Sequence, residues 1–269
     1  MSLGAALADL VLPTACAGCG AERVPLRSGA CAACVTALEA LTPYRTAPVP
    51  PPRGMPPCMA VGPYGGALRG MVLAYKEKGR HRLALPLGAL LAGAIAEVAP
   101  DRRCPVLVVP VPSTGRAARQ RHGDHMARLA AHAVRRLRAA GWQAEVTRPL
   151  RAAPRPDSAS LDAAGRLAAA ENSLRIRPTR IRVPRRGPTM RRTLVVVDDI
   201  VTTGATLAAV ATRLREADMQ VTGAAVLAAT DLRRASPGGT TALASGGPTR
   251  PKVTGSGPQP RGDVRASAR

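Results

Sequence analysis

The chain has 269 residues, enough for one or two domains, and its hydrophobic fraction of 46% and charged fraction of 21% are those of an ordinary globular protein. Lys+Arg exceed Asp+Glu by 39 − 17 = +22, which favours phosphorylated or polyanionic partners. Only Lys76, Lys78 and Lys252 are lysines, so the charge also fits a compositional bias toward arginine. With 3 Tyr, 1 Trp and no Phe, the chain cannot build a base-stacking platform for single strands.

No segment reads as a membrane span or a secretion signal. The uncharged apolar run at residues 83–96 contains Pro86 and is shorter than a bilayer requires. The N-terminus has no basic region before its apolar stretch, and Asp9 interrupts that stretch. We therefore expect a cytoplasmic protein without a membrane span.

The N-terminal part divides by composition. Residues 1–45 hold four cysteines in a small module, and residues 46–58, with six prolines, predict a semi-rigid extended linker. Because the main apolar core starts beyond this linker, we expect the following domain to survive loss of the cysteine module.

From about residue 59 to 230, helical and extended patterns alternate. Near-continuous apolar strands between helices predict an α/β fold with an open, mainly parallel sheet covered on both faces. Gly141 is a plausible stop for the third helix. We expect helices at about 66–78, 82–98, 125–140 and 205–217, and strands at 106–111, 142–147, 194–197 and about 221–228.

Two further segments lack this periodicity. Residues 149–190 are rich in Arg, Pro and Ala, and this segment is too long to be a simple connecting loop without a function. Residues 231–269 hold few large apolar side chains, which predicts a disordered basic tail.

The cysteines are spaced as two pairs, Cys16-x2-Cys19 and Cys31-x2-Cys34. Each pair can form a tight thiolate turn, and two such turns complete the tetrahedron of a closed structural Zn²⁺ site. Redox pairs or buried free thiols are the alternatives. The spacing favours a small zinc ribbon whose folding energy comes from the metal.

Residues 194–206, LVVVDDIVTTGAT, are the most informative stretch. A buried strand leads to Asp198 and Asp199, and a turn rich in hydroxyl groups then opens a helix. Unpaired N–H groups and the helix dipole suit a phosphate, and the carboxylates suit sugar hydroxyls or a hydrated Mg²⁺. The alternative is a capped surface helix with a solvated acidic pair. The phosphate-binding candidates are Thr202, Thr203, Gly204, Ala205 and Thr206.

This stretch resembles the phosphoribosyl pyrophosphate signature of type I phosphoribosyltransferases. Over residues 10–230 the chain is similar to the ComF-type competence family of that superfamily, which carries an N-terminal zinc ribbon. The motifs behind the resemblance are the cysteine pairs, AYKEKGR, VVPVPST with the following arginines, LRAAPRPDSASLDAAGR and VVVDDIVTTGATL.

The resemblance implies a type I phosphoribosyltransferase-like fold and a substrate, phosphoribosyl pyrophosphate, that binds with Mg²⁺. It implies that Asp198 and Asp199 contact the ribose hydroxyls and that the turn at 202–206 holds the 5′-phosphate. Pro112, Ser113 and Thr114 would lie by the pyrophosphate, whose charge Arg116, Arg119 and Arg151 are candidates to stabilise. Each arginine has a solvated surface charge as its alternative. We expect His122, His125 and His132 to be surface or loop residues and not bases.

Two functions follow from these observations. The first is a phosphoribosyltransferase that acts on an unknown nucleophilic acceptor and releases pyrophosphate. The second is a non-catalytic protein that binds phosphoribosyl pyrophosphate and assists uptake or processing of single-stranded DNA, as the family name implies. Salt-sensitive DNA binding without turnover would separate the second from the first. The sequence leaves the acceptor and the oligomeric state open.

Overall fold

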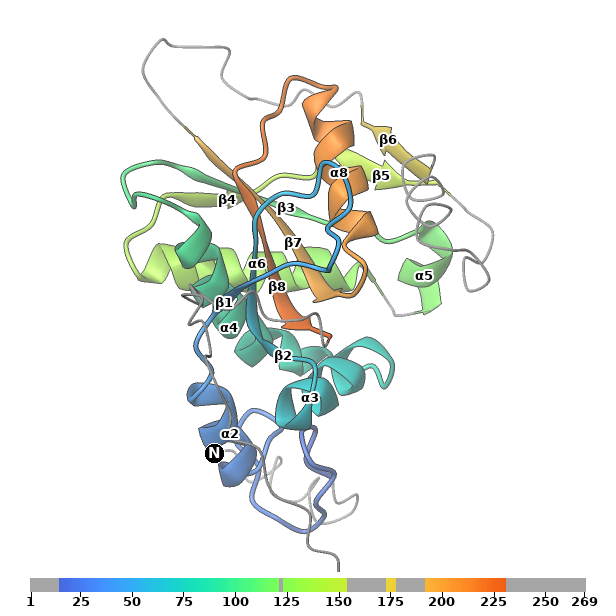
Figure 1. Ribbon diagram of the computed structural model, residues 1–269. Helices are drawn as coiled ribbons and strands as arrows, with labels where there is room; N and C mark the ends of the chain where they lie inside the picture. Colours follow the sequence, from blue (N-terminus) through green and yellow to red (C-terminus); the bar gives the residue numbers. More distant parts are fainter. Residues whose placement is uncertain (1–14, 121–122, 154–172, 178–191, 231–269) are drawn as a thin grey trace, which may run out of the picture. The chain divides into compact units, whose positions relative to one another are not determined.

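The computed structural model describes residues 15–120, 123–153, 173–177 and 192–230, and Figure 1 shows how their helices and strands are arranged. The predicted tail at 231–269 and most of the segment 149–190 lie outside these residues. The fold is α/β, as predicted, with a mixed but mostly parallel sheet of six strands and helices on both of its faces.

The sheet has the strand order β1-β2-β8-β7-β3-β4, in which only β1 runs antiparallel to its neighbour. β3 and β8 are buried along their whole length and β7 is buried except at Asp198 and Ile200, as the apolar runs in the sequence predict. The strands are β1 (Tyr44–Thr46), β2 (Cys58–Pro63), β3 (Val106–Pro110), β4 (Ala144–Val146), β7 (Thr193–Val201) and β8 (Gly223–Ala229).

Side-chain alternation along the strands divides the apolar interior between two faces. On β7, Val195 and Val197 pack in one cluster with α3 (Gly66–Lys76), α4 (Ala84–Val98) and α6 (His125–Ala139). Val196 packs on the other face with α8 (Ala205–Arg215). Figure 1 shows α4 and α6 on one side of the sheet and α8 on the other.

The helices lie close to their predicted ranges. α6 buries the apolar stripe expected of it and ends before Gly141, which adopts φ +84°. The predicted helix at 82–98 begins as a 3-10 turn, His81–Leu83, and continues as α4. By length and composition, His81–Val98 is the one stretch of the described residues that could cross a membrane, but Leu87, Leu91 and Ile95 pack in the core.

The cysteine module is not separate from the sheet domain. It consists of two turns, an isolated bridge between Arg27 and Ala30, and helix α2 (Ala32–Glu39). Cys16, Cys34 and Leu38 are buried in the same apolar cluster as α3 and α4. The expectation that the domain's core is independent of the module is therefore wrong, because the two share one continuous core.

The proline-rich segment also packs against the domain. β1 pairs with β2, so the segment interpreted as a linker starts and ends in the main sheet. A side chain on Gly54 would come within 3.1 Å of the Thr212 hydroxyl on α8. The segment is thus a crossing loop over the sheet domain, although its prolines suggest a spacer.

The aperiodic region contains a small additional sheet. β5 (Leu150–Ala152) and β6 (Leu174–Ile176) pair antiparallel, with Leu150 and Leu174 buried against the α8 face. A bridge between Thr114 and Ala152 connects β5 to the turn that follows β3. Helix α5 (Gly115–Gln120) begins directly after that turn.

Candidate functional site

Asp198 and Asp199 are on β7, but that strand does not end at them. The parallel pairing with β8 continues to Val201, so β7 is four residues longer at this end than predicted. Successive residues of a strand point to opposite faces. Asp199 therefore lies on the face of α3 and α6, whereas Asp198 lies on the face of α8, with the turn at 202–206.

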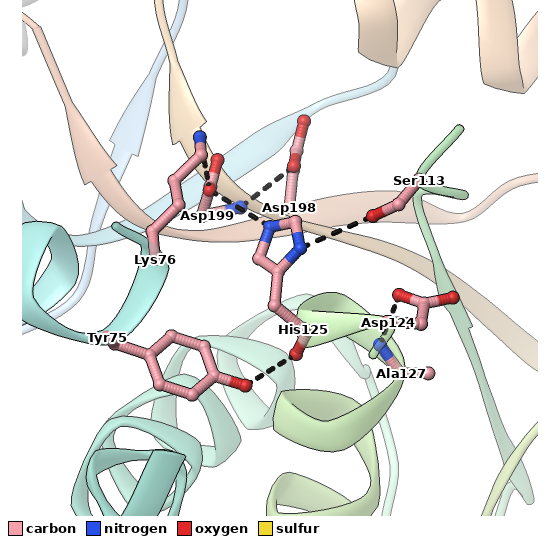
Figure 2. Close-up of polar contacts among 8 residues, drawn as sticks. All are labelled: Tyr75, Lys76, Ser113, Asp124, His125, Ala127, Asp198 and Asp199. Atoms are coloured by element: carbon pink, nitrogen blue, oxygen red, sulfur yellow. Dashed lines mark hydrogen bonds and ion pairs between the residues drawn. The ribbon is translucent and has the colours of Figure 1, made fainter. Parts of the chain in front are cut away.

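Asp199 is buried and holds two basic partners on one oxygen. The Lys76 ammonium, at the end of α3, lies 2.6 Å from Asp199 Oδ2. His125 Nε2, from the first turn of α6, lies 3.3 Å from the same oxygen. Figure 2 shows both side chains converging on this carboxylate. The other carboxylate oxygen has no partner among the described residues.

The two neighbouring carboxyls have opposite pKa shifts. Burial raises the pKa of Asp198 to about 7, and the adjacent negative charge of Asp199 acts in the same direction. Burial would also raise the pKa of Asp199, but the hydrogen bond from His125 and the charge of Lys76 outweigh it, so that pKa lies below its ordinary value. The pair therefore combines a firmly ionised carboxylate with one that titrates near neutrality.

The contacts of His125 extend toward the turn after β3. Its Nδ1 lies 3.3 Å from the Ser113 hydroxyl, and its main-chain oxygen accepts a 2.7 Å hydrogen bond from the Tyr75 hydroxyl. Asp124 caps α6 by accepting from Ala127 N at 3.1 Å. This chain of contacts, drawn in Figure 2, connects the predicted pyrophosphate turn to the predicted ribose carboxylate.

The turn between β7 and α8 forms a small concave cradle. Asp198 and residues 200–207 line a cavity of about 30 Å³ there. Gly204 adopts φ +72° and precedes the first residue of α8, so the first N–H groups of the helix lie at this turn, where Ala205 N is 3.5 Å from Thr203 Oγ1. Thr202 is exposed and Thr203 half-buried. These groups are the donors that a phosphate monoester requires.

A second structural feature explains why position 204 is a glycine. A Cβ at this position would lie 2.5 Å from Met55 Sδ and 3.2 Å from Pro48 Cγ. The missing side chain therefore makes room for the proline-rich loop, so a bulky substitution here disturbs packing as well as any bound phosphate.

The three arginines that we expect to neutralise the pyrophosphate are exposed to solvent. Arg116 and Arg119 are exposed on α5, and Arg151 is exposed on β5. The bridge between Thr114 and Ala152 brings β5 to the turn at 112–114. Among the described residues, no hydrogen bond or ion pair joins these arginines to the carboxylates.

The four cysteines of the N-terminal module converge as predicted. Their sulfur atoms all lie within 4.8 Å of one another, and Cys19 and Cys31 Sγ are 3.8 Å apart. A tetrahedron with Zn–S bonds of about 2.3 Å has S–S edges of about 3.8 Å. Cys16, Cys19, Cys31 and Cys34 thus fit a structural zinc ion.

Sequence reasoning missed two members of the site. Lys76 belongs to AYKEKGR but was given no role, although a lysine is rare in a chain that otherwise uses arginine. His125 is 7% exposed and contacts Asp199, so the expectation of a surface or loop residue is wrong for it. Nothing in the local pattern of HGDH distinguishes His125 from His122.

One segment of the chain is similar to a known protein family. Residues 168–240 match the model of the phosphoribosyl transferase domain. This segment of the chain, about a quarter of its 269 residues, is therefore similar to that domain. The match includes β7, the cradle at 202–206, α8 and β8, whereas Lys76, His125 and Ser113 of the candidate site lie outside it. A search of curated proteins found no match.

Proposed function

We propose that this protein binds phosphoribosyl pyrophosphate with Mg²⁺ and transfers the phosphoribosyl group to a nucleophilic acceptor, releasing pyrophosphate. The observation that carries the proposal is the junction of β7 and α8 within the matched segment. One carboxylate on each face of β7 is followed by a turn that lines a small cavity at the N-terminus of α8. We also propose that the chain belongs to the ComF-type family, because a four-cysteine module precedes the matched segment.

In this proposal each residue has a distinct role. The turn at 202–206 binds the 5′-phosphate through main-chain N–H groups and hydroxyls. The ionised Asp199 accepts hydrogen bonds from ribose hydroxyls through its unoccupied oxygen, in bonds stronger than neutral ones. Ser113 and Thr114 lie on the pyrophosphate side. Arg116 and Arg119 follow them directly in the chain, and the bridge between Thr114 and Ala152 brings Arg151 to the same turn, so these arginines neutralise the leaving group.

The chemical step exchanges one bond at the anomeric carbon. The bond from C1′ to the pyrophosphate oxygen breaks and takes its electron pair with the leaving group, while the acceptor's lone pair forms the new bond and its proton passes to solvent. Mg²⁺, when bound, supplies charge neutralisation of the pyrophosphate. Carboxylate oxygens such as those of Asp198 are donors that suit it. The carboxylates also stabilise positive charge that develops on the sugar ring.

The test is a calorimetric titration of the protein with Mg²⁺ and phosphoribosyl pyrophosphate. We expect Asp198→Asn/Asp199→Asn to weaken binding by about 2–4 kcal/mol, the scale of lost charged hydrogen bonds. Thr202→Ala, an exposed change in the cradle, should weaken it less and keep the fold. Asp218→Asn, in an exposed turn, is the matched control and should bind normally. Unchanged affinity in both site variants would refute the assigned site.

Turnover is tested separately by measuring pyrophosphate release with a panel of nitrogenous bases and amines. Release with any acceptor supports transfer. Ligand binding without release, together with salt-sensitive binding of single-stranded DNA, would instead favour the non-catalytic competence function. A cytoplasmic location belongs to the same proposal, since it keeps the cysteines reduced.

A further inference from the structure

Helix α3 lies between the cysteine module and the candidate site. Its middle rests on the first cysteine turn: a Cβ at Gly70 would lie 2.0 Å from the Gly18 carbonyl oxygen and 2.7 Å from that of Ala17. No side chain fits there, so the main chains of the helix and the turn are in direct contact. The last residue of the same helix is Lys76, whose ammonium binds Asp199.

The first cysteine turn is itself fixed by the second. A Cβ at Gly18 would lie 2.7 Å from Cys34 Sγ and 3.3 Å from the Ala67 side chain on α3. Gly18 is therefore enclosed between a thiol of the zinc cluster and the helix. Any separation of the four sulfur atoms moves the surface on which α3 rests.

A second set of contacts holds the segment that follows α3. Arg80 Nη1 donates a 2.7 Å hydrogen bond to the Ala15 carbonyl oxygen, and a Cβ at Gly29 would lie 2.8 Å from Leu83 Cδ2. The module thus contacts the chain on both sides of Lys76, at Gly70 and at residues 80–83.

Such fixation matters because a lysine holds an ion pair poorly by itself. Its four-carbon stem loses rotamer freedom in the pair, and partly exposed pairs contribute little to stability unless their geometry is fixed. The Lys76 side chain is 25% exposed, whereas that of Asp199 is 8% exposed. The position of α3 therefore decides whether the buried carboxylate keeps its closest cation.

We propose that the four-cysteine module, closed around Zn²⁺, positions α3 so that Lys76 stays on Asp199. Lys76 is then a positioning residue for Asp199, and the module is part of the architecture of the site. The consequence for phosphoribosyl pyrophosphate rests on the proposed function, whereas the link from the cysteines to Lys76 does not.

The decisive measurement is the rate at which the Lys76 ammonium protons exchange with water. The chain has three lysines, so ¹⁵N-lysine NMR gives a simple spectrum, and loss of a signal in Lys76→Arg assigns it. In the zinc-loaded protein we expect Lys76 to show slower ammonium exchange with water than Lys78 and Lys252. Gly70→Ala should remove that difference. Gly93→Ala is the matched control, because its Cβ would meet only Pro43 Cγ at 3.9 Å.

Zinc withdrawal tests the same link in the unaltered chain. A chelator in reducing buffer should abolish the slow exchange of Lys76, and added Zn²⁺ should restore it. This arm decides the matter if Gly70→Ala does not fold. Slow exchange that persists without zinc, or in folded Gly70→Ala, would overturn the proposal.

A binding measurement tests whether the contact between the cysteine module and α3 affects ligand binding at the candidate site. Gly70→Ala and Lys76→Met should each weaken Mg²⁺–phosphoribosyl pyrophosphate binding about tenfold, and their combination should weaken it little further. Lys76→Arg should recover part of the loss, which a general packing defect would not allow. Multiplying effects in the double variant would contradict the proposal. If the wild-type chain does not bind this ligand, the proposed function fails while the NMR arms still decide the link.

Discussion

Two adjacent carboxylates in one motif have different environments because a strand places neighbours on opposite faces. Asp199 points into the side where Lys76 and His125 supply positive charge and a hydrogen-bond donor. Asp198 lies on the side of α8, where Oδ1 accepts from the Asp199 N–H at 2.9 Å. Alternation along the strand thus gives one carboxyl whose pKa is lowered and one whose pKa is raised to about 7.

The raised pKa of Asp198 predicts a pH-dependent penalty on stability. Its folded-state pKa of about 7 exceeds the ordinary value, so the folded state prefers the protonated form. Stability is therefore lost as pH rises from about 4 to about 7. Asp198→Asn cannot ionise and keeps an oxygen for the Asp199 N–H. We expect urea unfolding to show the variant about 2–4 kcal/mol more stable than the wild type at about pH 8.

This advantage should disappear at about pH 4, where the wild-type carboxyl is also neutral. Asp218→Asn, in an exposed turn, is the control and should show no such pH-dependent gain. An equal effect of Asp198→Asn at both pH values would mean that the side chain does not titrate as described.

At the scale of elements, the start of α6 determines where His125 lies. Asp124 accepts from Ala127 N, and Arg148 Nη2 lies 2.7 Å from its other oxygen. We expect Asp124→Ala to lower the free energy of unfolding by about 1–2 kcal/mol, because the first turn loses its cap. Asp124→Asn keeps the capping oxygen and should lose less than half of that. Chemical denaturation measures both, and equal losses would assign the effect to the Arg148 ion pair.

The turn before α8 supports a prediction about the proline-rich loop. Gly204→Ala adds about 1 kcal/mol of backbone strain at φ +72° and a contact with Met55 that costs about 1–3 kcal/mol more. Gly141→Ala isolates the backbone effect, since φ is +84° and no atom lies within 4 Å of the added Cβ. Thermal unfolding should therefore show a larger loss at Gly204.

The double variant Gly204→Ala/Met55→Ala removes the sulfur that the new side chain meets. Because the closest contact is gone and only the 3.2 Å approach to Pro48 Cγ remains, its loss relative to Met55→Ala should fall toward that of Gly141→Ala. A Gly204→Ala penalty that does not depend on Met55 would show that the loop does not press on this turn.

The elements that the sequence predicted well are those in which local and tertiary preferences agree. α6 has a clear apolar stripe and a glycine stop, so its limits followed from pattern alone. The end of β7 did not, because Asp198 and Asp199 interrupt the apolar run, and pairing with β8 continues the strand past them to Val201. β1 was missed since Tyr44–Thr46 is short and becomes a strand only by pairing with β2.

In the candidate site too, local sequence predicted some residues, and only the packing of helices explains the others. Asp198, Asp199 and the turn at 202–206 are contiguous in sequence, so their proximity was predictable. Lys76 and His125 reach Asp199 from helices distant in the chain, and only the packing of α3 and α6 brings them together. The rarity of lysine in an arginine-rich chain was the one signal available for Lys76, and His125 had none.

At the scale of the whole molecule, the cysteine module and the sheet domain share one apolar cluster, in which Cys16 and Cys34 are buried together with residues of α3 and α4. A shared core predicts a single cooperative unfolding transition and not two. Zinc bound by the module then stabilises the entire unit by mass action, since the unfolded chain lacks the closed site.

We therefore expect Cys16→Ser to lose the zinc and to lower the midpoint of this one transition by at least about 5 °C, as a loss of 2 kcal/mol or more requires in a domain of this size. Cys104→Ser is the matched control, because Cys104 is half-buried and lies outside the sulfur cluster, and it should keep both zinc and midpoint. Calorimetry with metal analysis measures both quantities. A Cys16→Ser protein without zinc, whose main transition stays at the wild-type temperature while a small separate one disappears, would show that the module folds by itself and that the continuous core contributes nothing to the domain.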